Sequence, residues 1–285
     1  MFIGEIPKSF FKENLLFTST NNVQVVCQHF FAKTKTTYFN YIRRYKDGSK
    51  ISLSNCSCWH KYFYENKLFE NVLEIERQTI IEQPPIGAIK IVSWNNTPDA
   101  QEVQEQSVYF NIGNGISLAI VHGSYIEYCY FGTENKNIDV SNWYINNVST
   151  LIEFIHYFKD KTANIIAEAS LPKNRIDYCN NMKLLNEKKD LFISSQHDSD
   201  HVKPKRYFVD IGNKEIPITA REMDCIKYIF RGYPSSQVGR LLGISERTVE
   251  KHIENVKERL GCHSKSDLID VLLESGLNSL IGNQK

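Results

Sequence analysis

The sequence predicts two domains of different class: an α+β domain in which helices flank an antiparallel sheet, followed by an all-α domain of four helices. Its 285 residues exceed the usual size of one domain. Strand-like and helix-like segments mix in the first part, whereas short amphipathic segments with clear helix start and stop signals fill the last part. We therefore expect a sensor-like domain over residues 1–171, a linker over 172–206 and a helical domain over 207–285.

The composition is that of an ordinary globular protein, with 41% hydrophobic and 24% charged residues and a net charge of +1. These values exclude disordered and collagen-like chains. Any binding to DNA must come from a local arrangement of Lys and Arg, because the net charge supplies almost no long-range attraction. The chain shows neither a signal peptide nor a long apolar run, so we expect a cytoplasmic protein without membrane contact.

The cysteines do not predict a metal site. The chain has seven, an odd number, and its one close pair, Cys56 and Cys58, has a single residue between the two. Zinc sites and redox pairs usually need two or more intervening residues. We expect free thiols in a reducing compartment, and neither a metal nor another cofactor.

Alternating and β-branched segments predict the strands of the first domain. Residues 36–42 and 51–54 flank the turn pair Asp47 and Gly48, which predicts a hairpin. Further strands are expected over 87–94, 115–121 and 125–131, and the short connection at 122–124 makes the last two antiparallel. Helical spacing appears over 59–69, 99–110 and 148–169, so helices should pack on the sheet.

Apolar residues become sparse over 172–206, which favours a linker. The His and Asp residues at 197–201 are the kind of ligands that a metal would use, but a solvated segment explains them better. After the linker, residues 207–210 and 215–218 flank Gly212 and Asn213, so a small hairpin should lead into the helical domain.

Four helices are expected in the last domain. Thr219 and Glu222 form a capping-box signature for the first, and Gly232 and Pro234 end it. Ser235 or Ser236 should cap a short second helix that ends at Gly243. Ser245 should cap a third, and residues 264–275 form a fourth that packs on the core or pairs with another subunit.

The third helix has two distinct faces. Apolar residues at 249, 253, 256 and 260 fall within one narrow sector. Polar side chains occupy the other side, namely Arg247, Lys251, Glu254 and Glu258, with Glu250 and Asn255 at the margins. Two helices joined by a tight turn, the second with one buried and one polar face, match a DNA-binding helix-turn-helix at about residues 235–260.

The order and spacing of the motifs in this domain resemble the LuxR-type helix-turn-helix family. The matching residues are 219–222, Gly232, 242–245, 248–252, Asn255 and 260–261. One departure is Gly239, where the family usually has Ala. The resemblance implies a homodimer with the third helix in the major groove of double-stranded DNA. It implies DNA contacts from Ser245, Arg247, Thr248, Glu250, Lys251, Glu254 and Asn255, and dimer contacts from Leu268, Val271 and Leu272.

The first domain resembles, more loosely, the autoinducer-binding (PAS/GAF-like) domain of the same family. The matching features are Trp59, Phe63, Trp94 and the glycines at 113 and 115. The resemblance implies that these aromatic residues bind a small hydrophobic signal molecule, as in quorum sensing. The family's Asp-Pro pair is missing, since the chain has Glu70 to Glu74 in this segment, so the family's amide recognition does not carry over.

The leading hypothesis is a ligand-responsive transcription regulator that also contacts RNA polymerase and is not an enzyme. In one alternative the first domain only dimerises or contacts a partner. In another, His29, His60, His122 and His156 converge in an enzyme or signalling domain. A third possibility is a helix-turn-helix that binds protein, which the three glutamates on its exposed face favour.

Overall fold

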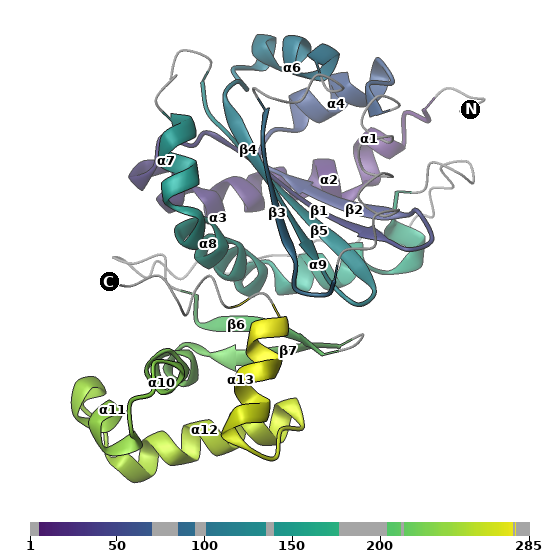
Figure 1. The fold of residues 1–285 in the computed structure, drawn as a ribbon. Helices are drawn as coiled ribbons and strands as arrows, with labels where there is room; N and C mark the ends of the chain where they lie inside the picture. The colour runs from purple at the N-terminus through teal and green to yellow at the C-terminus, as the bar shows by residue number, and fades with distance from the viewer. Residues whose placement is uncertain are drawn as a thin grey trace.

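A five-stranded antiparallel sheet forms the centre of the N-terminal domain in the computed structural model (Figure 1). The structure describes residues 6–69, 85–94, 101–134, 140–176, 204–211, 214–275 and 277. The strand order is β2-β1-β5-β4-β3. The strands are β1 (Tyr38–Tyr45), β2 (Lys50–Ser54), β3 (Ile89–Ser93), β4 (Gly115–Val121) and β5 (Tyr125–Gly132). The predicted sheet and its two hairpins are confirmed.

One face of the sheet packs on two long helices, α3 (Thr20–Lys33) and α8 (Val148–Lys161). Phe30 of α3 stacks on Phe154 of α8 with ring centroids 4.1 Å apart, and Phe39 of β1 meets Phe154 edge-on at 5.0 Å. The predicted helix over 148–169 is interrupted at Thr162, which separates α8 from α9 (Ala163–Ala169). The Thr162 hydroxyl donates to the Phe158 carbonyl oxygen at 2.7 Å, a local bond typical of such breaks.

Sequence patterns did not predict the helices at the start of the chain. These are α1 (Phe10–Glu13), α2 (Leu15–Thr18) and α3, and α7 (Val140–Asn146) was missed as well. The segment 10–18 is apolar without a clear helical period, and α1 and α2 have four residues each. Tertiary packing holds them, since Phe10 and Leu16 are buried in a cluster with Tyr64.

The opposite face of the sheet carries α4 (Ser57–Glu65), α6 (Gln101–Ser107) and the 3-10 turn η3 (Val108–Phe110). The helix expected over 59–69 ends earlier, at Glu65, because Lys67 has a positive φ of 55°. In the same way Asn111 adopts a φ of 56° after η3, which ends the expected helix over 99–110. Both positions take a conformation that stops helices.

The ends of the expected linker pack on the domains. Residues 172–174 form the turn η4 (Pro172–Asn174), and Ile176 pairs with Lys50 at the edge of the sheet. Arg206 already begins β6. The stretch between them, 177–203, including the His and Asp run at 197–201, lies outside the described residues.

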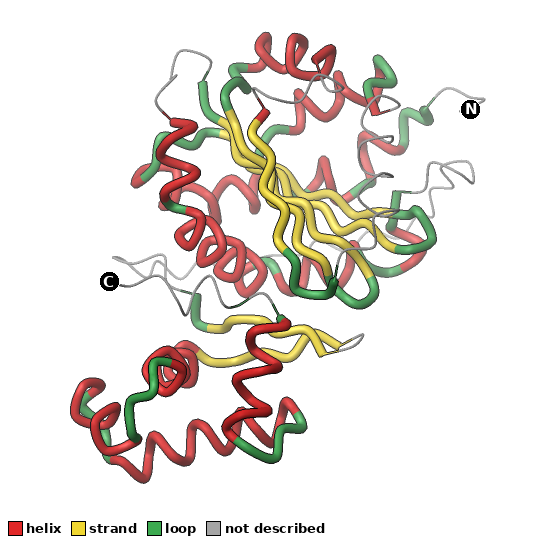
Figure 2. The backbone as a smooth tube through the Cα atoms, viewed as in Figure 1, coloured by secondary structure: helices red, strands yellow, loops and turns green. Residues whose placement is uncertain are grey.

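The C-terminal domain combines a two-stranded hairpin with four helices, and Figure 2 shows its hairpin as a sheet separate from the larger one. The elements are β6 (Arg206–Ile211), β7 (Lys214–Thr219), α10 (Ala220–Phe230), α11 (Ser235–Leu242), α12 (Glu246–Leu260) and α13 (Lys265–Glu274). Thr219 and Glu222 form the predicted capping box of α10, and Ser245 caps α12 as predicted. The expected Ser cap of α11 is wrong: Pro234 is its N-cap, and Ser235 and Ser236 are already helical.

Within the part of the chain that the structure describes, no helix has the length and apolarity needed to cross a membrane.

Candidate nucleic-acid interface and aromatic face

The turn between α11 and α12 fixes how the two helices cross. Gly243 ends α11 in the left-handed conformation at φ 66°. The Ile244 amide then donates to the Gly239 carbonyl oxygen at 3.0 Å. The Ser245 hydroxyl oxygen accepts from the Thr248 amide at 3.1 Å, which satisfies a free donor of the first turn of α12. These local bonds produce a compact helix-turn-helix.

One side of α12 is buried and the other is open to solvent. Its predicted apolar stripe lies in the domain core: Val249, Ile253, Val256 and Leu260. The expected DNA-contacting residues are brought together on the outer side of the helix. Ser245, Arg247, Thr248, Glu250, Lys251 and Glu254 are exposed, and Asn255 is half-buried. In Figure 1, α12 lies on the side of its domain remote from the N-terminal domain.

Ion pairs change the balance of charge along α12. Its segment contains four acidic and four basic residues. Lys257 Nζ lies 3.0 Å from Glu254 Oε2, so this glutamate already has a positive partner. Arg259 Nη2 lies 2.5 Å from Glu222 Oε2 and joins α12 to the capping box of α10. Lys251 and Arg247 remain as exposed cations near the start of the helix.

Arg240 is a further exposed cation, and sequence patterns alone did not select it. It lies on α11. In helix-turn-helix proteins the first helix crosses the DNA backbone, where an arginine meets phosphates. The signal that would have identified Arg240 is its place in the last turn of that helix.

Two of the three dimer residues expected on α13 are buried in its own domain. Leu268 and Leu272 are 2% and 1% exposed, because they pack into the core of their own domain. Val271 is half-buried and Leu273 is 43% exposed. The apolar side chains that reach the surface of this helix are therefore Ile269, Val271 and Leu273.

The three aromatic residues selected in the N-terminal domain come together in one cluster on the α4 side of the sheet. Trp59 is buried, and its ring lies 5.8 Å from Phe63 and 5.4 Å from Phe110. Trp94 approaches the same cluster from the end of β3, with its ring 6.4 Å from that of Tyr38. We call this surface the aromatic face: Tyr38, Trp59, Tyr62, Phe63, Trp94, Phe110 and Tyr130.

Two glycines make room for Trp94 on the sheet. Gly115 and Gly132 are direct partners in β4 and β5. A Cβ atom on Gly115 would lie 2.5 Å from the Trp94 ring, and one on Gly132 would lie 3.0 Å away. The indole Nε1 donates to the Ser117 hydroxyl at 2.7 Å. The glycine pair and this bond fix the ring against the backbone of the sheet.

Polar groups at the aromatic face are few and mutually bonded. Tyr62 donates to Gln106 Oε1 at 2.8 Å. The Tyr38 hydroxyl lies 3.2 Å from His60 Nε2, and burial lowers the pKa of His60 to about 3, so the ring is neutral. Glu70 and Glu74, the two acids considered as replacements for the missing Asp, lie outside the described residues.

The histidines do not converge on one site. His60 lies at the aromatic face, whereas His122 and His156 both reach the β6–β7 hairpin of the other domain. His29 belongs to α3 and lies apart from both groups in the fold.

The geometry of α11 and α12 defines the class of the C-terminal domain: a helix-turn-helix DNA-binding domain with an outward recognition helix. Residues 217–272 match the family described as "Bacterial regulatory proteins, luxR family". The C-terminal domain is therefore a LuxR-family helix-turn-helix domain.

Similar sequences include segments of two proteins named as transcription regulators. Over 66 residues the chain is 35% identical to the transcriptional regulatory protein MctR of Rhizobium johnstonii, a match that covers 23% of this chain and 31% of that protein. A putative HTH-type transcriptional regulator, y4qH of Sinorhizobium fredii, is 39% identical over 54 residues, covering 19% of this chain and 17% of that protein. The Fimbriae Z protein of Salmonella typhimurium is 30% identical over 59 residues, covering 21% and 28%. The matched segments span less than a third of these relatives.

Among solved structures, Escherichia coli SdiA covers 92% of this chain and 92% of its own length, at 13% identity and a TM-score of 0.36. A TM-score of this size does not establish a shared fold.

Proposed function

We propose that this protein is a transcription regulator that binds double-stranded DNA as a homodimer and responds to a small hydrophobic molecule through its N-terminal domain. The exposed polar face of α12, within a domain of the LuxR family, is the observation that carries the proposal. A regulator of this kind works in the bacterial cytoplasm, where the DNA lies, and acts through RNA polymerase rather than by catalysis.

The side chains on α12 suit two kinds of DNA contact. Arg247 and Thr248 lie at the start of the helix, where a cation and a hydroxyl bind phosphates. Lys251 lies one turn further and donates to guanine acceptors, while Glu250 accepts from the cytosine amino group. The negative charge of Glu254 repels DNA less strongly than that of an unpaired glutamate, because Lys257 pairs with it.

A dimer fits this mixed surface. One module with balanced charges gains little non-specific attraction from phosphates, so two copies on a two-fold operator supply the missing affinity. In α13, half-buried Ile269 and Val271 and exposed Leu273 are the apolar side chains available to a partner. Leu268 and Leu272 support the contact from within the domain core.

The DNA proposal is tested by measuring binding of Lys251→Ala and Arg247→Ala to selected genomic fragments and to random DNA at several salt concentrations. We expect Lys251→Ala to lose about 10-fold or more on the selected site with little change on random DNA. Arg247→Ala should weaken both DNAs by a similar factor and reduce the salt slope by about 1, because it removes a phosphate contact.

Lys265→Ala is the matched control, since Lys265 is exposed at the start of α13, outside the α12 surface. Equal losses on both DNAs for Lys251→Ala would refute its role in base recognition. Complete absence of fragment-specific, salt-dependent binding by the wild type would instead favour a protein-binding helix-turn-helix.

The sensor role is supported by the aromatic face, whose rings and few polar anchors resemble the lining of a small-molecule site. The packed cluster equally suits a domain that only dimerises or contacts a partner. Mass spectrometry of a lipophilic extract from purified protein tests this, together with thermal shifts on a panel of acyl-homoserine lactones. If no molecule is bound and no lactone shifts the melting temperature, the N-terminal domain is not a sensor of this kind, and its role is dimerisation or contact with a partner.

A further inference from the structure

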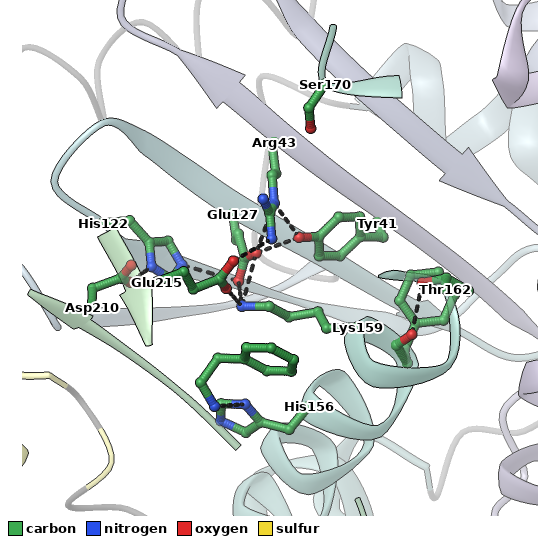
Figure 3. Close-up of polar contacts among 12 residues, drawn as sticks. Tyr41, Arg43, His122, Glu127, His156, Lys159, Thr162, Ser170, Asp210 and Glu215 are labelled. Atoms are coloured by element: carbon green, nitrogen blue, oxygen red, sulfur yellow. Dashed lines mark hydrogen bonds and ion pairs between the residues drawn. The ribbon is translucent and has the colours of Figure 1, made fainter. Parts of the chain in front are cut away.

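The two domains meet at a cluster of charged and polar side chains, most of them buried, drawn in Figure 3. Residues of β1, β5, α8 and the β4–β5 turn supply one side of it, and the β6–β7 hairpin of the DNA-binding domain supplies the other. We call this cluster the interdomain latch: Arg43, His122, Glu127 and Lys159 from the N-terminal domain with Asp210 and Glu215 from the hairpin.

Glu127 is the centre of the N-terminal side. Its side chain is 1% exposed, and it lies directly opposite Arg43 in the β1–β5 pair. Arg43 Nε and Lys159 Nζ each lie 3.2 Å from its carboxylate, and His122 Nε2 lies 3.0 Å away. The Tyr41 hydroxyl also donates to Glu127. Burial opposes ionisation, but Lys159, His122 and Arg43 hold the pKa of Glu127 well below its usual range.

The hairpin supplies the charge that the N-terminal side lacks. Without it, the cations Arg43 and Lys159 would face the single carboxylate of Glu127. Glu215 of β7 lies 3.0 Å from Arg43 Nη2 and contacts Lys159 as well, so it balances the second cation. Asp210 of β6 contacts Nδ1 of His122. Removing one partner of such a buried cluster leaves an uncompensated charge, which is strongly unfavourable.

A hydrogen bond from a backbone amide to a side chain also joins the two domains. The Phe208 amide in β6 donates to His156 Nδ1 in α8 at 3.1 Å. Burial lowers the pKa of His156 to about 3, so its ring is neutral and Nδ1 can accept. In the hairpin register Phe208 is opposite Pro217, and its amide is directed to His156 in the other domain. Exchange of the Phe208 amide with solvent therefore reports on the contact between the domains.

The latch and the aromatic face lie on opposite faces of the sheet, with Arg43 five residues beyond Tyr38 along β1. Successive side chains of a strand point to opposite faces of the sheet. Arg43 and Glu127 face α8 and the hairpin, whereas their neighbours Ile42 and Tyr128 are partners on the other face. That second face also carries Tyr38 of the aromatic cluster, on the same strand as Arg43. The strands β1 and β5 therefore carry residues of both the latch and the aromatic face.

We propose that the interdomain latch holds the helix-turn-helix domain in one orientation on the N-terminal sheet and so sets the relative positions of the two recognition helices in a dimer. This inference rests on the proposed function, since it requires a dimeric DNA-binding protein. The docked domain leaves α12 facing away from the sheet, so the latch orients the helix and does not cover it (Figure 1). Two half-sites demand a fixed spacing of the two helices, whereas one half-site does not.

The test compares Glu215→Gln with the wild type in the full chain. Glu274→Gln is the matched control, because it removes the same charge at an exposed position of α13. We expect Phe208 to exchange on the order of 100-fold faster in Glu215→Gln. The amides of Val249 and Ile253 in α12 should keep their wild-type rates, and the radius of gyration from small-angle scattering should increase. Affinity for a DNA with two half-sites should fall on the order of 10-fold, while affinity for a single half-site stays unchanged.

A second variant keeps the test decisive if Glu215→Gln does not fold. Arg206→Gln removes a more exposed interdomain ion pair, in which Arg206 Nε lies 2.6 Å from Asp160 Oδ1. Its Phe208 amide should exchange about twofold to fivefold faster. Unchanged Phe208 exchange in both variants would overturn the latch, and so would equal acceleration of Phe208 and α12, which signals unfolding of the domain. If the latch opens as expected but the wild type binds neither DNA, the proposed function fails while the interdomain contact stands.

Discussion

Gly239→Ala tests the geometry of the helix-turn-helix directly. In an ordinary helix this change is favourable by about 1 kcal/mol, because glycine loses more backbone entropy on folding than alanine. Here a Cβ atom on residue 239 would lie 2.7 Å from the Ile244 carbonyl oxygen and 3.2 Å from the Glu246 nitrogen. Both are backbone atoms of the turn that leads into α12, so neither can rotate away as a side chain would.

The magnitude follows from the shortfall in distance. Ordinary van der Waals contact starts at 3.4 Å, so the turn must move by about 0.7 Å (3.4 minus 2.7) to accept the methyl group. Overpacking of this kind costs about 1–3 kcal/mol. After the gain in helix propensity we expect the local free energy of unfolding to fall by up to about 2 kcal/mol. The same movement tilts α12 relative to α11 and weakens binding to DNA.

Native-state hydrogen exchange of the α11 and α12 amides in the full chain measures this change in local stability. Ser236→Ala on α11 is the control. Its hydroxyl does not cap the helix, which begins after Pro234, so we expect a change within about 0.5 kcal/mol. Equal or slower exchange in Gly239→Ala with unchanged DNA affinity would refute the steric argument, and would indicate that the turn adapts to alanine without cost.

Two further predictions concern the N-terminal domain and the latch. Gly115→Ala would place a Cβ 2.5 Å from both the Phe131 carbonyl oxygen and the Trp94 ring. Thermal unfolding should then show that the free energy of unfolding falls by about 2 kcal/mol or more. An unchanged melting temperature would contradict this packing. Lowering the pH should open the latch. Burial opposes ionisation of Glu215, but Lys159 and Arg43 hold its pKa below the ordinary 4.5. Docking is therefore complete above pH 4.5 and is lost as the pH falls through the lowered pKa. Phe208 exchange corrected for its intrinsic pH dependence measures this change, and tighter docking in acid would refute the sign.

Local signals in the sequence determined most of the C-terminal domain. The capping residues Thr219 and Ser245 and the left-handed Gly243 each act within a few residues of the chain. The spacing of Val249, Ile253, Val256 and Leu260 likewise depends only on the helical period, so the polar face of α12 was predictable. Even here Pro234 replaced the expected serine cap, because the fixed φ of proline also suits the position before a helix.

Hairpins in the N-terminal sheet were also predictable, because short turns such as the one at Gly48 join neighbouring strands. The pairing of β1 with β5 was not predictable. Tyr45 pairs with Tyr125, which lies 80 residues further along the chain (125 minus 45), and no local pattern links the two strands. Partners so distant in sequence are chosen by the burial of the whole sheet face and not by local propensity.

Only the tertiary structure decided the latch. From the sequence, Lys159 is a solvated residue near the end of an amphipathic helix and Glu127 a polar residue in a strand, yet both side chains are at most 3% exposed. Burying either charge alone is too costly, so each depends on partners that the fold brings from other elements, and Glu215 comes from the other domain. The sequence by itself determined the helix caps, turns and apolar stripes, which depend on residues within one or two helical turns of each other. Charge pairing between distant segments has no local signature and exists only once the chain has folded.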